Sequence, residues 1–155
     1  MRVILLATGL VVGLLVGTVM GATAMHFLDS PLFEEPRINF QTIYFAKADM
    51  KIFTVARVWG WTKDHEEVRL CSEPFEFGKR DQTDRCVVFF ADRIFYKKDG
   101  ETGLLVFAPD SSVSPDIKDS IGQIRLTVKR LKTFEEIKDY EKNFETYGLT
   151  TIAAP

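Results

Sequence analysis

The feature that most constrains this chain is an uncharged apolar run close to its amino terminus. No charged side chain occurs from Val3 to Met25, and Val, Leu and Ile dominate the run. At about 1.5 Å per residue, a helix over this run would reach roughly 35 Å, and a bilayer's hydrocarbon core is about 30 Å thick. The sequence therefore predicts a transmembrane helix over residues 1–25.

A cleaved signal peptide is the alternative interpretation of the same run. Arg2 provides the basic start of such a peptide, and Ala22–Ala24 provides small residues before a cut. Signal-peptide apolar cores usually span about 7 to 15 residues, fewer than are present here. A retained anchor is therefore favoured, and a secreted or periplasmic binding domain released after Ala24 stays open.

Glycines divide the apolar run at a regular interval. Gly9, Gly13, Gly17 and Gly21 recur every four residues and so follow one slowly rotating helix face. Small residues let membrane helices approach closely, and this approach drives their association in lipid. The pattern predicts a packing face within the membrane, whose partner is another copy of the chain or a different membrane protein.

The charges that flank the run predict its orientation. Arg2 precedes the run, whereas Asp29, Glu34 and Glu35 lead the opposite flank. Because positive charge is retained on the cytoplasmic side, the short amino terminus is expected in the cytoplasm. Both interpretations of the leader then place the rest of the chain in the periplasm or an equivalent extracytoplasmic space.

Residues 26–37 form a short neck, and residues 38–155 have the length of one domain. Pro31 and Pro36 each disfavour helix in the residue before them, so the neck is expected to be a stiff spacer. The net charge is −2, with 20 basic and 22 acidic residues well mixed along the chain. Nucleic acid is therefore not an expected partner, because its binders concentrate basic residues in one region.

The domain is predicted to be rich in strands. β-Branched and aromatic residues, or an alternation of apolar and polar residues, mark several segments. These segments are Ile38–Ala46, Ile52–Trp61, Glu67–Cys71, Cys86–Phe90 with Ile94–Tyr96, Leu104–Ala108 and Ile124–Lys129. The turn-forming residues Lys98–Gly103 predict an antiparallel hairpin between two of them.

A helix is predicted after the last of these strands. Thr133 followed by Glu136 forms a capping box, and Gly148 stands where a helix would stop. The residues that share one face of this helix are Phe134, Ile137, Tyr140, Phe144 and Tyr147. Packing of this face onto the sheet is favoured over a peptide groove. The predicted fold is α+β, with one antiparallel sheet of five or six strands and a C-terminal amphipathic helix.

Cys71 and Cys86 are the only cysteines of the chain. An even number of cysteines in an extracytoplasmic domain predicts a disulfide. It would close a loop of about 15 residues and constrain the unfolded chain by roughly 3 kcal/mol. Two separate buried thiols are the alternative.

No motif predicts catalysis or cofactor binding. His65 is the only histidine after the neck and lies in a polar turn, and no serine has a Gly-x-Ser-x-Gly context. No phosphate loop, calcium loop or zinc-ligand spacing occurs. An enzyme, a cofactor and a bound metal are therefore not expected.

Arg57, Trp59 and Trp61 alternate along one predicted strand and so share one of its faces. Burial in the core is the first interpretation, and an exposed patch with the Trp and Arg composition of interface hot spots is the alternative. The glycine face, the short neck and the absence of catalytic motifs lead to the functional prediction of a single-pass membrane subunit, structural or accessory, of an envelope protein complex. Its partners would be lipid and other membrane proteins.

Overall fold

The computed structural model describes residues 36–60, 65–75 and 85–155 of the chain. Residues 36–155 form one compact unit. The predicted transmembrane helix, its glycines Gly9, Gly13, Gly17 and Gly21, and Trp61 lie outside the described residues. Within those residues, the helices are too short or too polar to cross a bilayer.

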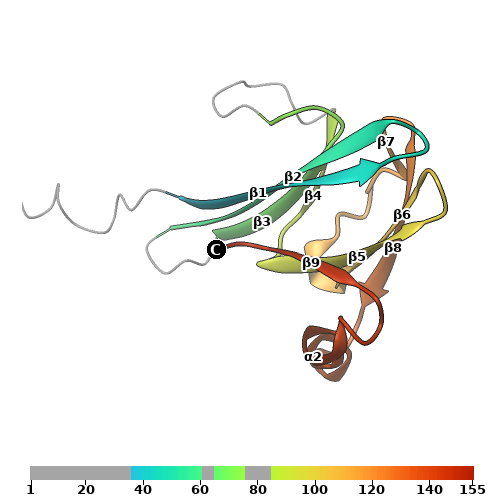
Figure 1. Ribbon diagram of the computed structural model, residues 1–155. Helices are drawn as coiled ribbons and strands as arrows, with labels where there is room; N and C mark the ends of the chain where they lie inside the picture. The colour runs from blue at the N-terminus through green and yellow to red at the C-terminus, as the bar shows by residue number, and fades with distance from the viewer. Residues whose placement is uncertain (1–35, 61–64, 76–84) are drawn as a thin grey trace, which may run out of the picture. The chain divides into compact units, whose positions relative to one another are not determined.

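Four strands form the first sheet, and every neighbouring pair in it is antiparallel. In sheet order they are β1 (Arg37–Phe45), β2 (Met50–Trp59), β3 (His65–Cys71) and β4 (Cys86–Phe89). Sheet order equals chain order, so the chain meanders from one edge to the other (Figure 1).

Five strands form the second sheet, in an order that differs from their order in the chain. In sheet order they are β7 (Ser120–Ile121), β8 (Ile124–Leu131), β6 (Gly103–Pro109), β5 (Arg93–Asp99) and β9 (Thr150–Ala153). β6 and β8 run parallel, because the chain crosses between them through the 3₁₀ turn η3 (Asp110–Ser112) and β7. The other pairs are antiparallel.

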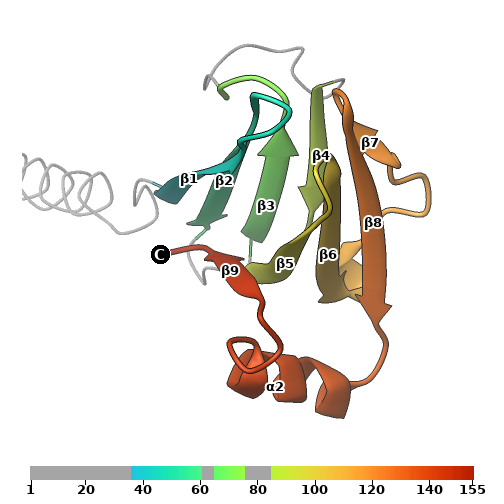
Figure 2. The same ribbon diagram turned by 45° about the vertical axis from the view of Figure 1, so that its right-hand side comes forward.

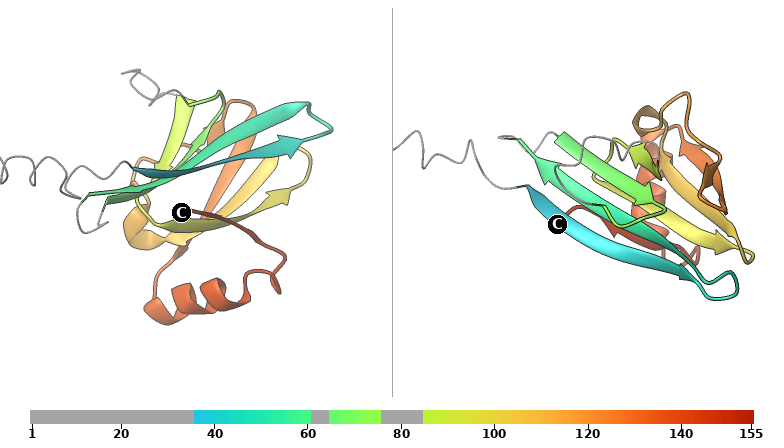
Figure 3. Two further views of the ribbon diagram at one scale, coloured as in Figure 1. Left: turned by 60° about the vertical axis from the view of Figure 1, so that its left-hand side comes forward. Right: turned by 90° about the horizontal axis from the view of Figure 1, so that it is seen from above.

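The two sheets pack face to face around one apolar core (Figure 3). Each strand contributes its alternate inward side chains, as a half-buried strand must. The largest of those that are almost fully buried include Ile52, Leu70 and Phe89 from the first sheet and Ile94 from the second. The fold of the described residues is therefore a β-sandwich.

The predicted α+β fold with a single sheet is wrong. Cys86–Phe90 and Ile94–Tyr96 were expected to belong to one sheet, but the short link Phe90–Asp92 carries the chain from β4 in one sheet to β5 in the other. Local alternation reports which side chains are buried and not which sheet buries them. The two short strands β7 and β9 were also missed.

The described residues contain one α-helix, α2 (Phe134–Asn143), in the connection from β8 to β9, and Figure 2 shows it near the end of β8. Its start follows the prediction, because the Thr133 hydroxyl accepts a hydrogen bond from the Glu136 N–H at 3.1 Å. The helix does not end the fold. Gly148, with a φ of 66°, lies in the turn that leads on to β9.

The helix packs through part of its predicted face. Ile137, Tyr140 and Phe144 contact a second apolar cluster, whose buried members are Phe95, Phe107, Leu131 and Leu149. Phe134 is 65% exposed and Tyr147 is 44% exposed, so neither end of the predicted stripe is covered. Tyr147 lies beyond the end of α2, whereas Phe134 lies in its first turn and is left exposed there.

The predicted hairpin is confirmed between β5 and β6, with Asp99 opposite Gly103 at its end. Gly100 has a φ of 74°, a backbone conformation that glycine adopts without strain. A Cβ atom at Gly103 would lie 2.2 Å from the Asp99 carbonyl oxygen, so only glycine fits there.

Candidate functional site

The outward side of the first sheet carries a buried glutamate that two arginines contact. Alternation on β2 and β3 turns Ala56, Val68 and Leu70 into the core, which leaves Arg57 and Glu67 pointing outward. These two residues lie directly opposite each other in the register of the two strands. We define the arginine–aromatic face as Arg57, Trp59, Glu67, Arg69 and Phe75.

Glu67 lies at the centre of this face, and only 3% of the residue is exposed. Its carboxylate accepts a hydrogen bond from Arg57 Nε. It also accepts hydrogen bonds from Arg69, at 2.6 Å from Nε and 3.1 Å from Nη2. Two guanidinium groups therefore share one carboxylate.

Each arginine is also stacked on an aromatic ring. The Arg57 guanidinium lies 4.2 Å from the centre of the Trp59 ring, and that of Arg69 lies 4.9 Å from the centre of the Phe75 ring. Trp59 stacks in turn on His65, with the ring centres 5.6 Å apart. Ion pairing and stacking together hold both guanidinium groups in place, which lowers the entropy lost when a partner binds them.

An apolar hollow of about 250 Å³ adjoins the arginine–aromatic face. Its lining includes Phe40, Phe53, Val55 and Phe75, from β1, β2 and the segment after β3. The hollow is smaller than the roughly 300 to 1,000 Å³ of sites that enclose a small molecule. It suits one or two apolar side chains of a partner placed beside the arginines.

The structure brings Arg57 and Trp59 together on one face of β2. They lie on the outer face of the first sheet, half-buried, and not in the core between the sheets. Glu67 and Arg69 were missed as members of the same face. Their alternation along β3 was visible, but the register that sets Glu67 beside Arg57 is a long-range property.

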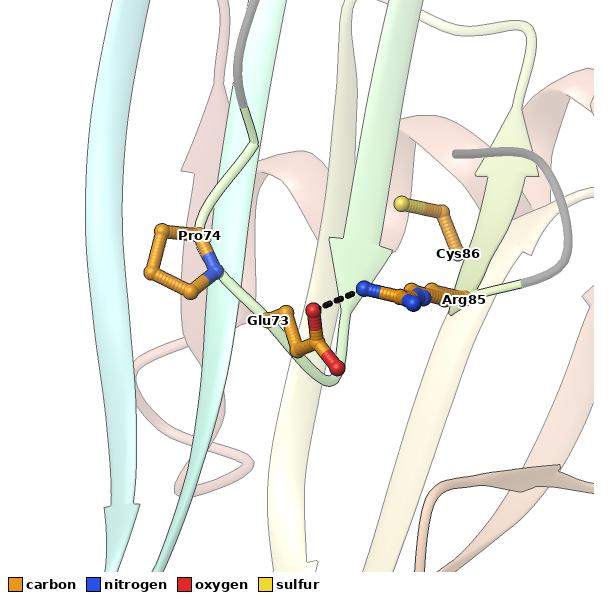
Figure 4. A pocket seen from close by; sticks show the side chains of 4 residues that line it. All are labelled: Glu73, Pro74, Arg85 and Cys86. Atoms are coloured by element: carbon orange, nitrogen blue, oxygen red, sulfur yellow. Dashed lines mark hydrogen bonds and ion pairs between the residues drawn. The ribbon is translucent and has the colours of Figure 1, made fainter. Parts of the chain in front are cut away.

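The predicted disulfide between Cys71 and Cys86 is confirmed. These residues lie opposite each other on β3 and β4, with their Cα atoms 4.1 Å apart. Beside them, Arg85 Nη1 donates to the Glu73 carboxylate across a small hollow (Figure 4). At about 20 Å³ this hollow holds one water molecule at most, so it is no ligand site.

The described side chains that could exchange a proton are not gathered into one site. His65 stacks on Trp59, and Glu73 pairs with Arg85 at the far end of β3. Burial raises the pKa of the Glu66 carboxyl, and the nearby Asp92 carboxylate raises it further. Across the described ranges, no group of three or more His, Cys, Asp and Glu side chains is placed to hold a metal ion.

Comparison with known proteins identifies no relative. No family model matches the chain, and neither a curated protein nor a solved structure shows significant similarity to it.

Proposed function

We propose that this chain is a non-catalytic assembly subunit of an envelope protein complex, and that its domain binds a partner protein through the arginine–aromatic face. The observation that carries the proposal is the buried Glu67 carboxylate, which holds Arg57 and Arg69 in fixed positions on an outer surface. The core of a sandwich lies between its sheets, so this charged cluster on the outer side is not part of that core.

The chemistry of the face defines the partner. Fixed arginines beside aromatic rings form the type of surface that dominates the binding energy of protein interfaces. The fixed guanidinium groups favour a carboxylate on the partner, and the adjoining hollow favours an apolar side chain. We therefore expect an acidic protein surface with at least one exposed apolar anchor.

The apolar leader from Val3 to Met25 supports attachment to a membrane, with the domain outside the cytoplasm. The intact mass of the mature chain tests this attachment. Retention of the leader is expected. A mature chain that begins at Met25 would instead make the protein a secreted or periplasmic binding domain.

Site-specific photocrosslinking of the full chain in its native membrane tests the proposed interface. A photoreactive phenylalanine at Val88, opposite Arg69 on β4, is expected to form an adduct with one discrete protein. The matched control carries the same probe at Phe134, which is exposed on α2. Equal adducts from both positions, or none from Val88, would contradict the proposal.

Charge changes on the same face give a second measurement. In the chain that carries the probe at Val88, Arg69→Glu should remove the adduct, because it places a carboxylate where the partner's carboxylate is expected. Arg125→Glu reverses an equal charge on β8 in the second sheet and should leave the adduct unchanged. Survival of the adduct in the Arg69→Glu variant would exclude the arginine–aromatic face as the interface.

A further inference from the structure

The four sheet edges of the described residues differ in length. β4 and β9 have 4 residues each and β7 has 2, whereas β1 has 9. β4 is also partly covered, because Phe89 bridges to Val113 and the Phe90 N–H donates to the Ser112 carbonyl at 3.0 Å. β1 is therefore the one long edge in this part of the chain.

β1 has few of the features by which natural edge strands avoid pairing with another chain. It contains no proline, lysine or acidic residue, and its register with β2 runs without a bulge from Arg37 to Phe45. Within the described residues, its main-chain hydrogen bonds to other main-chain groups go to β2 alone. One protecting contact exists near the turn, where Lys98 Nζ donates to the Tyr44 carbonyl at 2.6 Å. Long apolar edges of this kind are templates for strand addition.

The side chains of β1 are almost all uncharged, and several are exposed. Phe40 is 58% exposed and Tyr44 is 44% exposed, and both lie on the outward side of the strand with Ile38 and Thr42. The only charged residue of β1 is Arg37, at its first position.

We propose that β1 pairs antiparallel with β1 of a second copy of this chain, about a two-fold axis at its central residue, Gln41. The first sheets of the two copies would then form one continuous sheet. This inference goes beyond the proposed function, because it uses the edge of the first sheet and not the arginine–aromatic face.

The sequence of β1 suits pairing with itself in this register. Phe40 faces Thr42 of the second copy, and Ile38 faces Tyr44 of the second copy, so each exposed aromatic side chain contacts the other chain. Arg37 faces Phe45 of the second copy, so the Arg37 residues of the two copies lie at opposite ends of the paired strands. No like charges therefore lie opposite each other, as an interface between identical surfaces requires.

Cysteine crosslinking of the full chain in detergent tests the register. Directly opposite residues in an antiparallel pair have Cα atoms about 4.5 to 5.5 Å apart, within the range that a disulfide spans. Under mild oxidation, Gln41→Cys should therefore give a covalent dimer as its main product. Thr127→Cys, exposed on β8, is the matched control and should stay mostly monomeric. Absence of the Gln41→Cys dimer, or equal crosslinking of the control, would overturn the proposal.

A charge-pair experiment tests the same register without cysteine. Phe40→Lys and Thr42→Glu should each lower the dimer association constant, by about fivefold to tenfold, because each removes the Phe40–Thr42 contact twice across the axis. The double variant should recover association, since the introduced lysine of each copy would then face the introduced glutamate of the other. Single variants that associate like the parent chain, or a double variant no better than either single one, would overturn the proposed pairing.

The two proposals fail separately in these experiments. Arg69→Glu should leave the Gln41→Cys crosslink intact, because Arg69 lies two strands away from β1. If the Gln41→Cys variant gives no covalent dimer but the probe at Val88 still forms its adduct, β1 pairing is rejected and the proposed function is kept.

Discussion

At the scale of single residues, the burial of Glu67 is the least expected feature of the sandwich. Its carboxylate is buried on the outer side of a sheet and accepts hydrogen bonds from two arginines. An acidic residue in an alternating strand normally indicates the solvated face. Here the guanidinium groups and the aromatic rings around them take the place of solvent, so an outward position is also a buried one.

Removal of the Glu67 carboxylate should destabilise the domain. Glu67→Ala leaves two neighbouring guanidinium groups without their shared acceptor, and we expect a loss of about 2 to 3 kcal/mol in the free energy of unfolding. Chemical denaturation followed by circular dichroism measures it. The control is Glu73→Ala, which removes an exposed ion pair with Arg85 and should cost less than about 1 kcal/mol. Equal losses in the two variants would contradict the role given to burial.

Asp139 offers a pH-dependent prediction at the same scale. The Tyr147 hydroxyl, first, and the Asn143 amide, second, donate to its carboxylate and lower the pKa of Asp139 below its usual 3.8. A lowered folded-state pKa contributes stability above the unfolded-state pKa, and this contribution is lost as the pH falls through the folded-state value. Below about pH 4 the turn after α2 should therefore loosen.

Tyr147→Phe tests this assignment. The variant lacks the largest cause of the shift, so the pKa of Asp139 should rise toward 3.8 in a carboxyl-carbon NMR titration. Tyr44→Phe removes a hydroxyl that bonds Asp49 instead and should leave the pKa of Asp139 unchanged. If the pKa of Asp139 is the same in the Tyr147→Phe variant and the parent chain, the hydrogen bond does not control it.

At the scale of elements, α2 shows how a helix can be positioned by only part of its apolar face. Phe144 stacks on Phe95 of the second sheet, with ring centres 5.6 Å apart, whereas Phe134 at the first turn is 65% exposed. Both residues belong to one stripe in the sequence. Only the docked helix shows that the stripe leaves the sheet at its amino-terminal end.

This difference predicts unequal effects from identical substitutions. Phe144→Ala should lower the free energy of unfolding by about 2 to 3 kcal/mol, because it removes a half-buried ring from the cluster under the helix. Phe134→Ala should change it by less than about 0.5 kcal/mol. Thermal or urea unfolding of the two variants measures the comparison. A loss for Phe134→Ala that matches the loss for Phe144→Ala would show that the first turn is also docked.

The elements also show how far the sequence allows prediction. Local chemistry was sufficient for the β5–β6 hairpin, the start of α2 and the alternation of β8, since turn, capping and periodicity signals act over a few residues. The Cys71–Cys86 pairing followed from an even cysteine count. The parallel pairing of β6 with β8 was beyond these signals, because it joins strands separated by a crossover.

At the scale of the whole molecule, the same distinction explains the wrong fold class. A segment with many strands and one helix is compatible with both an α+β fold and a sandwich until each strand is assigned to a sheet. The short link between β4 and β5 decides between them, because it moves the chain to a second sheet within three residues, Phe90–Asp92. The candidate site has a similar origin, since its arginines and glutamate meet through the register of β2 and β3.

The shared core predicts that the two sheets unfold together. Leu70 from β3 and Leu104 from β6 are both almost fully buried in the cluster between the sheets. Leu70→Ala and Leu104→Ala should each lower the free energy of unfolding by about 2 to 5 kcal/mol. A typical domain is stable by about 5 to 15 kcal/mol, so both variants should still fold. Because neither sheet has another partner for its inner side, a cavity made in one sheet should weaken both equally.

Two probes on opposite sheets can test this coupling. Tryptophan fluorescence reports on the end of β2 in the first sheet, and amide exchange along β6 reports on the second. For each leucine variant, the free energy of unfolding is obtained once from the urea transition of the fluorescence and once from the denaturant dependence of β6 exchange. Both values should fall by the same amount, with unchanged m values. If Leu104→Ala weakened β6 and left the fluorescence transition in place, the sheets would be separate folding units, and the core between them would contribute little to cooperativity.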